Sequence, residues 1–152
     1  TERISLMNRQ LITFQINGQT LGMDIMAIRE IRAWSPATPL PNVDAHVRGV
    51  VNLRGVVLPV IDLKSKLGWG ATETDERHVI IVTSINDQLQ GIIADAVNDI
   101  VTVSQDQLQP PPSSNESQTQ TMLEALATVD DRVISVIALD RLANTPALAD
   151  AA

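Results

Sequence analysis

The sequence predicts an all-β fold made of two small, similar barrels that pack together and carry short helical turns. Short runs of branched aliphatic residues, separated by turn residues, indicate strands rather than long helices. The chain also repeats itself at a spacing of about 70 residues. A repeat with four or five strands has the length of a small closed barrel, a form that leaves no sheet edge unpaired. The 152 residues suffice for such cores without disulfide or metal staples.

Apolar runs separated by turn pairs define the predicted strands. The turn residues tolerate left-handed geometry, so successive strands are expected to pair as antiparallel hairpins. The predicted strands cover residues 11–16, 47–53, 56–63, 79–85, 92–103 and 133–139. The turn pairs are Asn17-Gly18, Arg54-Gly55, Asn86-Asp87 and Asp130-Asp131.

The stretch from Asp24 to Ile31 differs from these runs, because isoleucines recur three residues apart with charged residues between them. This spacing suits a helical turn joined to a strand, and the sequence leaves the order of the two open. Residues 104–121 are rich in Gln, Ser, Thr and Pro, which predicts a surface loop. Residues 139–142 are expected to form a last helical turn, and residues 144–152 a disordered tail.

Two blocks of the repeat align without gaps. Residues 16–31 match residues 85–100 at an offset of 69, and residues 57–63 match 133–139 at an offset of 76. The second half therefore carries seven more residues (76 − 69) between the two blocks, and the loop at 104–121 is their expected place. The repeat predicts one domain over 1–152, with a first subdomain over about 10–76 and a second over about 77–143.

Charge and composition exclude several function classes. The net charge is −7, which disfavours nucleic acid as a partner, and the three aromatic residues are too few for a base-stacking platform. The absence of cysteine excludes a disulfide framework and a thiolate metal site. No apolar stretch is long enough to cross a bilayer and no leader opens the chain, so a cytoplasmic location is expected.

No pattern of catalytic residues stands out. His46 and His78 are 32 positions apart without a second ligand at metal-binding spacing, so no metal or other cofactor is expected. Asp62 and Asp95 near strand ends are the candidate carboxylates, but the repeat places Ala138 opposite Asp62. We therefore expect both aspartates to accept hydrogen bonds from turn amides. The protein is predicted to be a binding module rather than an enzyme, with a ligand-binding or hydrolytic barrel as the alternative.

Two barrels in contact leave a groove between them, and apolar residues beside it could receive the apolar face of a helix. Ile25, Ile28 and Ile31 are candidates for this surface, although three-residue spacing predicts that at least one of them belongs to the core. The chain resembles the bacterial chemotaxis coupling proteins, the CheW family, from about Gln10 to Leu142. Two segments carry the resemblance: residues 14–31, and the block RGVVNLRGVVLPVIDL at residues 48–63.

The resemblance implies two SH3-like five-stranded barrels and an adaptor that links transmembrane chemoreceptors to the chemotaxis histidine kinase without catalysis. An excised regulatory domain of the kinase, which shares this fold, is the alternative. The family's receptor tip docks beside the first barrel, which carries that role onto Ile25, Ile28, Glu30, Gly49, Asn52 and Arg54. The kinase's regulatory domain packs on the second barrel, which carries that role onto Ile80 and Gly91.

Side-chain chemistry makes these roles plausible. Glu30 and Arg54 are expected to form an ion pair that orients the wall of the groove. A glycine at position 91 lets another backbone approach closely, as contact between two barrel edges requires.

Overall fold

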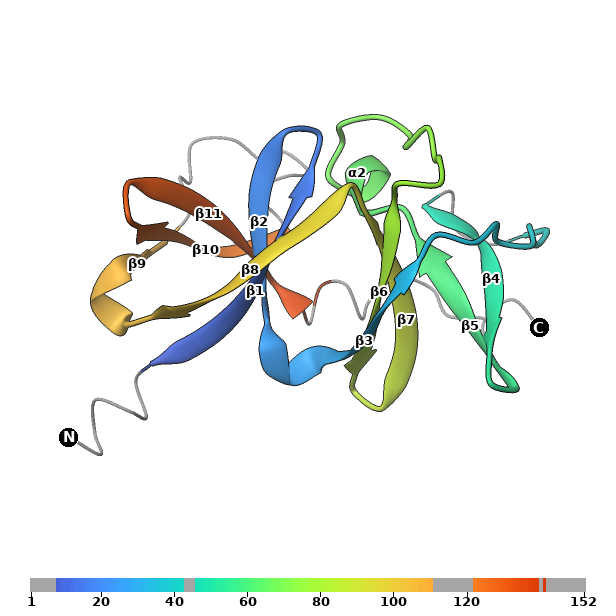
Figure 1. Ribbon diagram of the computed structural model, residues 1–152, viewed down its shortest axis with the longest axis horizontal. Coiled ribbons are helices and arrows are strands. Elements are labelled where there is room, and N and C mark those ends of the chain that lie inside the picture. The colour runs from blue at the N-terminus through green and yellow to red at the C-terminus, as the bar shows by residue number, and fades with distance from the viewer. Residues whose placement is uncertain (1–7, 43–45, 111–121, 140, 142–152) are drawn as a thin grey trace.

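The computed structural model describes residues 8–42, 46–110, 122–139 and 141, and it is built from strands with a few short helical turns (Figure 1). The strands are β1 (Arg9–Ile16), β2 (Gln19–Asp24), β3 (Ile28–Ala33), β4 (Val47–Leu53), β5 (Val56–Ile61), β6 (Val79–Ile85), β7 (Gln88–Ala94), β8 (Ala96–Val103), β9 (Leu108–Gln109), β10 (Leu123–Val129) and β11 (Arg132–Ile137). The helical elements are η1 (Ile25–Ala27), α2 (Leu63–Lys66) and η2 (Gln105–Gln107).

The strands form two sheets, which confirms the predicted all-β class. Sheet A has six strands in the order β8-β1-β2-β11-β10-β9, and sheet B has five in the order β3-β6-β7-β5-β4. The sixth strand of sheet A is the two-residue β9, whose Gln109 pairs with Leu126. Sheet B has an isolated bridge, Thr38 to Val50, at the corresponding place. The strand pairings run from one end strand of each sheet to the other and do not show that either sheet closes. Closure into barrels therefore stays a prediction.

Strand register reproduces the internal repeat. In sheet B, β5 pairs in parallel with β7 through Val60 and Gly91. In sheet A, β11 pairs in parallel with β2 through Val136 and Gly22. The offsets of 69 and 76 found in the sequence convert one pair into the other, so the two sheets are related as the two repeats are.

The sheets divide the chain differently from the predicted subdomains, 10–76 and 77–143. Sheet B uses strands from one continuous stretch, 28–94, whereas sheet A combines β1 and β2 with the strands from β8 onward. Figure 1 shows β8 leading from the end of β7 back across the molecule to sheet A. Each hairpin therefore pairs with strands of the other repeat. The repeat alone does not reveal this exchange, because equivalent strands in both repeats offer the same apolar pattern.

Left-handed residues build the four predicted hairpin turns. Each turn pair has positive φ at both positions, for example 52° at Arg54 and 87° at Gly55. The hairpins β1–β2, β4–β5, β6–β7 and β10–β11 are all antiparallel, as predicted. The prediction of one strand over 92–103 is wrong, because the chain bends at Asp95 and enters sheet A as β8. The predicted strand 56–63 ends at Ile61, because Asp62 caps α2.

The short helical elements follow local capping. The turn η1 precedes β3, and the Asp24 carboxylate accepts a hydrogen bond from the Met26 amide at 2.9 Å. The predicted helical turn is thus confirmed and its order settled. The predicted loop at 104–121 contains η2 and β9, while 111–121 and the predicted tail at 144–152 lie outside the described residues. No helix within the described part of the chain is long and apolar enough to span a membrane.

One apolar cluster joins the two sheets. It contains Phe14 and Leu21 from sheet A and Ile81 and Ile92 from sheet B, all at most 1% exposed. Smaller clusters lie within sheet A and within sheet B. Because the largest cluster is shared, the two sheets stabilise each other rather than folding over separate cores.

Gly22 and Gly91 each occupy a place where a side chain would overlap a core isoleucine. A Cβ atom at Gly22 would lie 2.8 Å from Cγ2 of Ile134, and one at Gly91 would lie 2.7 Å from Cγ2 of Ile80. We expect Gly22→Ala and Gly91→Ala each to lower the free energy of unfolding by about 1–3 kcal/mol, because neither β-branched neighbour can swing aside without disturbing the core. Chemical denaturation of both variants measures this. Losses of less than about 0.5 kcal/mol at both positions would contradict the assigned packing.

Candidate functional site

The first three predicted receptor-binding residues lie together where η1 passes into β3. Ile25 and Ile28 are half-buried, and Ile28 packs against the cluster shared by the sheets. Glu30 follows on β3 with its side chain 27% exposed. Ile28 therefore contributes to the core while part of it remains accessible, as the three-residue spacing predicted for at least one isoleucine.

The β4–β5 turn supplies the other polar residues of the predicted surface. The Asn52 side-chain oxygen accepts a hydrogen bond from the Gly55 amide at 2.8 Å and so holds the turn. Arg54 extends from the turn with its side chain 72% exposed, and its Nη2 donates to Oε2 of Glu30 at 3.2 Å. The predicted ion pair is confirmed. This ion pair links β3, the first strand in the order of sheet B, to the β4–β5 turn, which connects the last two strands in that order.

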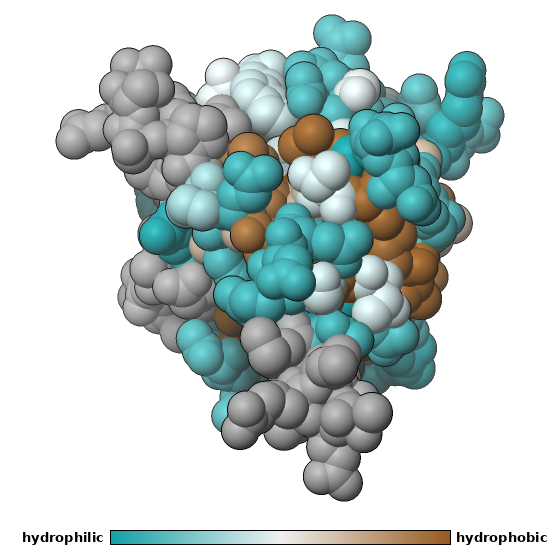
Figure 2. All heavy atoms as spheres, turned by 90° about the vertical axis from the view of Figure 1, so that its left-hand side faces the viewer, coloured by the Kyte–Doolittle hydropathy of each residue, from teal (hydrophilic) through white to brown (hydrophobic). Residues whose placement is uncertain are grey.

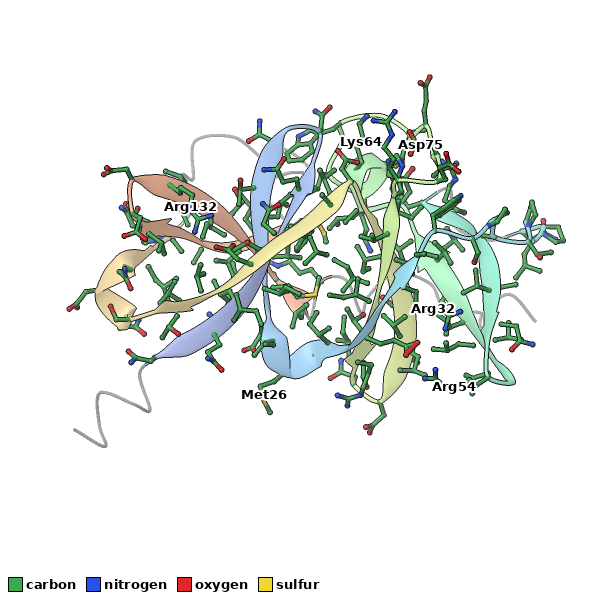
Figure 3. All side chains as sticks on the ribbon, in the orientation of Figure 1. Met26, Arg32, Arg54, Lys64, Asp75 and Arg132 are labelled. Carbon is green, nitrogen blue, oxygen red and sulfur yellow. The ribbon has the colours of Figure 1, made fainter. Side chains whose placement is uncertain are left out.

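A second arginine completes this cluster. Nη1 of Arg32 donates to Oε1 of Glu30 at 3.3 Å, so each carboxylate oxygen has its own guanidinium partner. Figure 3 shows Arg32 and Arg54 near each other, at the lower right of the molecule. Sequence reasoning missed Arg32, although its position two residues after Glu30 on a strand places both on one face. Glu30, Arg32 and Arg54 are called the charged triad below.

The charged triad affects the ionisation of Glu30. Partial desolvation raises the pKa of its carboxyl, but the hydrogen bonds and charges of Arg54 and Arg32 outweigh this and hold that pKa below its ordinary value. The carboxylate therefore stays ionised, and the cluster presents two arginines around one acid.

Exposed apolar side chains occur on the strands that carry the charged triad and on the preceding η1. Ile31 on β3 is 43% exposed, and Val56 and Val57 beside the β4–β5 turn are 48% and 54% exposed. Met26 on η1 is 80% exposed. Apolar residues next to exposed arginines are typical of protein-binding surfaces. The sequence patterns did not single out these residues for binding, except for Ile31.

Gly49, also predicted for receptor binding, lies below the surface. It is buried in β4 with φ of 149°, and a Cβ atom there would lie 2.3 Å from the carbonyl oxygen of Thr38. Thr38 and Val50 exchange two backbone hydrogen bonds across the same place. Gly49 thus allows the segment after β3 to pack against β4.

The two predicted kinase-binding residues are also internal. Ile80 is 1% exposed, and Gly91 is buried in β7 between β5 and β6. The expectation that Gly91 admits a second barrel edge needs correction, because both edges of β7 are already paired within sheet B. The backbone and side chains that approach Gly91 belong to this chain itself.

Sheet A carries an ion pair that corresponds to the charged triad. Asp99, the repeat equivalent of Glu30, lies 3.4 Å from Nη2 of Arg132. The hydrogen bond from the buried Thr13 hydroxyl is the main cause that lowers the pKa of Asp99, with Arg132 adding to it. Ile100 and Val133 are exposed apolar residues of this sheet. Figure 2 shows the sheet A end of the molecule, where hydrophobic areas alternate with a mainly hydrophilic surface.

The two candidate carboxylates are occupied by structural hydrogen bonds. Asp62 is 1% exposed and accepts from the Thr72 amide at 2.8 Å and the Thr72 hydroxyl at 2.5 Å, with Arg48 at 3.3 Å. Asp95 accepts from the Asn17 amide at 2.9 Å. The prediction of turn amides is confirmed for Asp95, whereas Asp62 binds the amide of an irregular segment at Thr72 and caps α2 through the Ser65 amide.

Three surface pockets lie away from the charged triad. One is lined by Trp34, Pro36 and Arg48, and another by Lys64, Glu73 and His78. The third lies beside β9 and Glu124. None of these three is lined by Ile25, Ile28 or Glu30, so the predicted receptor groove stays a prediction.

The sequence matches one family of known proteins along most of its length. A family model for the CheW-like domain matches residues 10–147. The chain belongs to the CheW-like family. It is 42% identical over 132 residues to the chemotaxis protein CheW of Rhizobium meliloti (strain 1021), which covers 87% of this chain and 85% of the relative. It is 32% identical to chemotaxis protein CheW of Bacillus subtilis (strain 168), over 94% of each chain.

A solved CheW structure has the same fold. The crystal structure of the scaffolding protein TtCheW from Thermoanaerobacter tengcongensis superimposes with a TM-score of 0.79 at 31% identity, covering 88% of this chain and 90% of that one. The two-sheet architecture is therefore that of a CheW-like chemotaxis scaffold. The predicted resemblance is confirmed along nearly the whole chain.

The ion pair between Arg54 and Glu30 predicts a measurable change in ionisation. Arg54→Ala should raise the pKa of Glu30 towards its ordinary value, which an NMR titration of the Glu30 carboxyl carbon measures. Because the folded-state pKa is lowered, the pair contributes stability above the pKa of glutamate in the unfolded chain and loses it as the pH falls through the folded value. Arg29→Ala, which removes an exposed arginine but leaves both partners, is the control. An unchanged Glu30 titration in Arg54→Ala would contradict the pairing.

Proposed function

We propose that the protein is a chemotaxis adaptor that couples transmembrane chemoreceptors to the chemotaxis histidine kinase, and that it acts through protein–protein binding without catalysis or a cofactor. The observation that carries the proposal is the charged triad on a CheW-like scaffold, with exposed apolar residues on the same strands. In this role the protein works in the cytoplasm, at receptor arrays on the inner face of the membrane.

The receptor partner is proposed to be the helical tip of a chemoreceptor, bound beside η1, β3 and the β4–β5 turn. The accessible parts of Ile25 and Ile28 would contact the apolar side of the helical hairpin. Glu30 and Arg54 would bind its polar side chains, and Asn52 holds the turn that presents Arg54. Gly49 is assigned an indirect role, because it allows the segment around Thr38 to support β4.

The kinase partner is proposed to be the regulatory domain, which is itself a CheW-like double sheet. Ile80 and Gly91 are buried, so their proposed role in kinase binding is indirect. A Cβ atom at Gly91 would lie 3.4 Å from Cδ1 of Leu58, the residue that follows the exposed Val57 on β5. Gly91 and Ile80 would thereby act on kinase binding through their packing against β5. A substitution such as Gly91→Arg tests folding before it tests kinase binding.

Two alternatives have less support. An excised regulatory domain of the kinase would share the fold, but several relatives that this chain matches over most of their length are named CheW. A ligand-binding or hydrolytic barrel would need free carboxylates, and Asp62 and Asp95 already accept the hydrogen bonds described above.

Reconstitution tests the adaptor function directly. Purified protein is added to receptor-containing membranes and the histidine kinase, together and singly, and co-sedimentation and kinase autophosphorylation are followed in the same samples. We expect binding to both partners and receptor-controlled autophosphorylation that rises only when all three components are present. Binding to neither partner would show that this member of the family has the fold without the coupling function.

Receptor docking should depend on the charged triad. Arg54→Ala and Glu30→Ala are each expected to weaken binding to receptor membranes about tenfold, which corresponds to the loss of one charge-assisted contact. The matched control is Arg132→Ala, which breaks the ion pair with Asp99 on sheet A. Titration with each folded variant measures the affinities. Equal affinities for wild type and Arg54→Ala would remove Arg54 from the receptor surface.

A further inference from the structure

Met26 is an apolar side chain held out into solvent. Its side chain is on η1, and the residue is 80% exposed, the highest value among the exposed large hydrophobic residues of the described chain. The Asp24 carboxylate holds the Met26 amide at 2.9 Å, so the turn that presents this residue is itself fixed. Figure 3 shows the Met26 side chain pointing away from the ribbon at the junction of the two sheets.

The repeat shows that this exposure is particular to one connection. An offset of 69 places Asp95 at the position equivalent to Met26. There the chain joins β7 to β8 without a helical turn, and Asp95 is bonded to the Asn17 amide and lies 3.2 Å from Nε2 of His78. In the β7–β8 connection Asp95 thus binds other residues of the chain. In the β2–β3 connection the side chain of Met26 points into solvent.

The other sulfur atoms of the described chain are shielded. Met23 is 0% exposed and Met122 is 5% exposed, and Met7 lies outside the described residues. The whole sequence has four methionines and no cysteine, so thioethers are its only sites for oxidation at sulfur. Met26 is therefore far more accessible to an oxidant than Met23 or Met122.

We propose that Met26 is a site of reversible oxidation by peroxide, and that its sulfoxide weakens docking of the receptor tip. Hydrogen peroxide transfers one oxygen atom to the thioether sulfur: the O–O bond breaks, an S–O bond forms, sulfur loses two electrons and the peroxide is reduced to water. A thiol-dependent methionine sulfoxide reductase reverses the step, oxidising two thiols to a disulfide and releasing water.

The effect on docking rests on the proposed function. Met26 directly follows Ile25 on η1, so a receptor helix that extends over this turn would lie beside the exposed thioether. A sulfoxide is polar and keeps its hydration, which opposes that burial. The sulfoxide is uncharged, so oxidation of Met26 does not change the charges of the charged triad.

Peptide mapping by mass spectrometry tests the chemical part alone. The protein is exposed to dilute hydrogen peroxide, and sulfoxide at each methionine is followed over time. We expect Met26 to oxidise at least about tenfold faster than Met23 and Met122, since attack on those two requires opening of the core. Equal rates at the three positions would overturn the assignment of Met26 as the reactive site.

Receptor binding before and after peroxide tests the consequence. Wild type and Met7→Leu should each lose about tenfold or more in affinity for receptor membranes, because the sulfoxide forfeits most of the transfer free energy of the thioether side chain. Reductase treatment should restore it. Met26→Leu, whatever its starting affinity, should change less than about twofold on the same treatment.

The outcomes separate the two proposals. If untreated protein does not bind receptor membranes, the adaptor function fails while the oxidation result stands by itself. If untreated protein binds and wild type oxidised at Met26 binds equally well, the adaptor function stands and the regulatory role of Met26 is overturned. A loss of binding that also occurs in Met26→Leu would assign the effect to another methionine and would likewise overturn it.

Discussion

The parallel pairing of β2 with β11, and of β5 with β7, is the contact on which the rest of the structure depends. Hairpins form between neighbouring strands, but these two ladders join strands from opposite repeats. Each includes a glycine, Gly22 or Gly91, whose missing side chain leaves room for Ile134 or Ile80 beneath it. Once both ladders are formed, the apolar faces of the two sheets cover one shared core.

The candidate site is a consequence of this exchange. Because sheet B takes all its strands from one continuous stretch, β3 and the β4–β5 turn belong to the same sheet, and Glu30 reaches Arg54. The same framework on sheet A brings Asp99 to Arg132. The two faces are alike in backbone but differ in charge: one acid bonded to two arginines on sheet B, one acid paired with one arginine on sheet A. The duplicated fold thereby presents two surfaces of different charge.

Local features were predictable where chemistry between near neighbours decides the structure. The hairpin turns were predicted from residue types that accept positive φ. The ion pair of Glu30 with Arg54 was predicted from their opposite charges in the two segments that resemble the CheW family. The surface roles of Gly49 and Gly91 did not follow in the same way. A glycine in a strand indicates that something approaches its backbone closely, and whether that neighbour is a partner or the chain itself depends on the packing.

By itself, the sequence determined the all-β class, the hairpins, the internal repeat and the family, because these depend on apolar spacing, turn chemistry and motifs within short stretches. Only the tertiary structure decided which repeat each hairpin joins, which of the predicted site residues reach the surface, and that Arg32 shares Glu30 with Arg54. The physical reason is that equivalent strands carry nearly the same pattern. Their choice of neighbour is therefore made by the packing of the whole core.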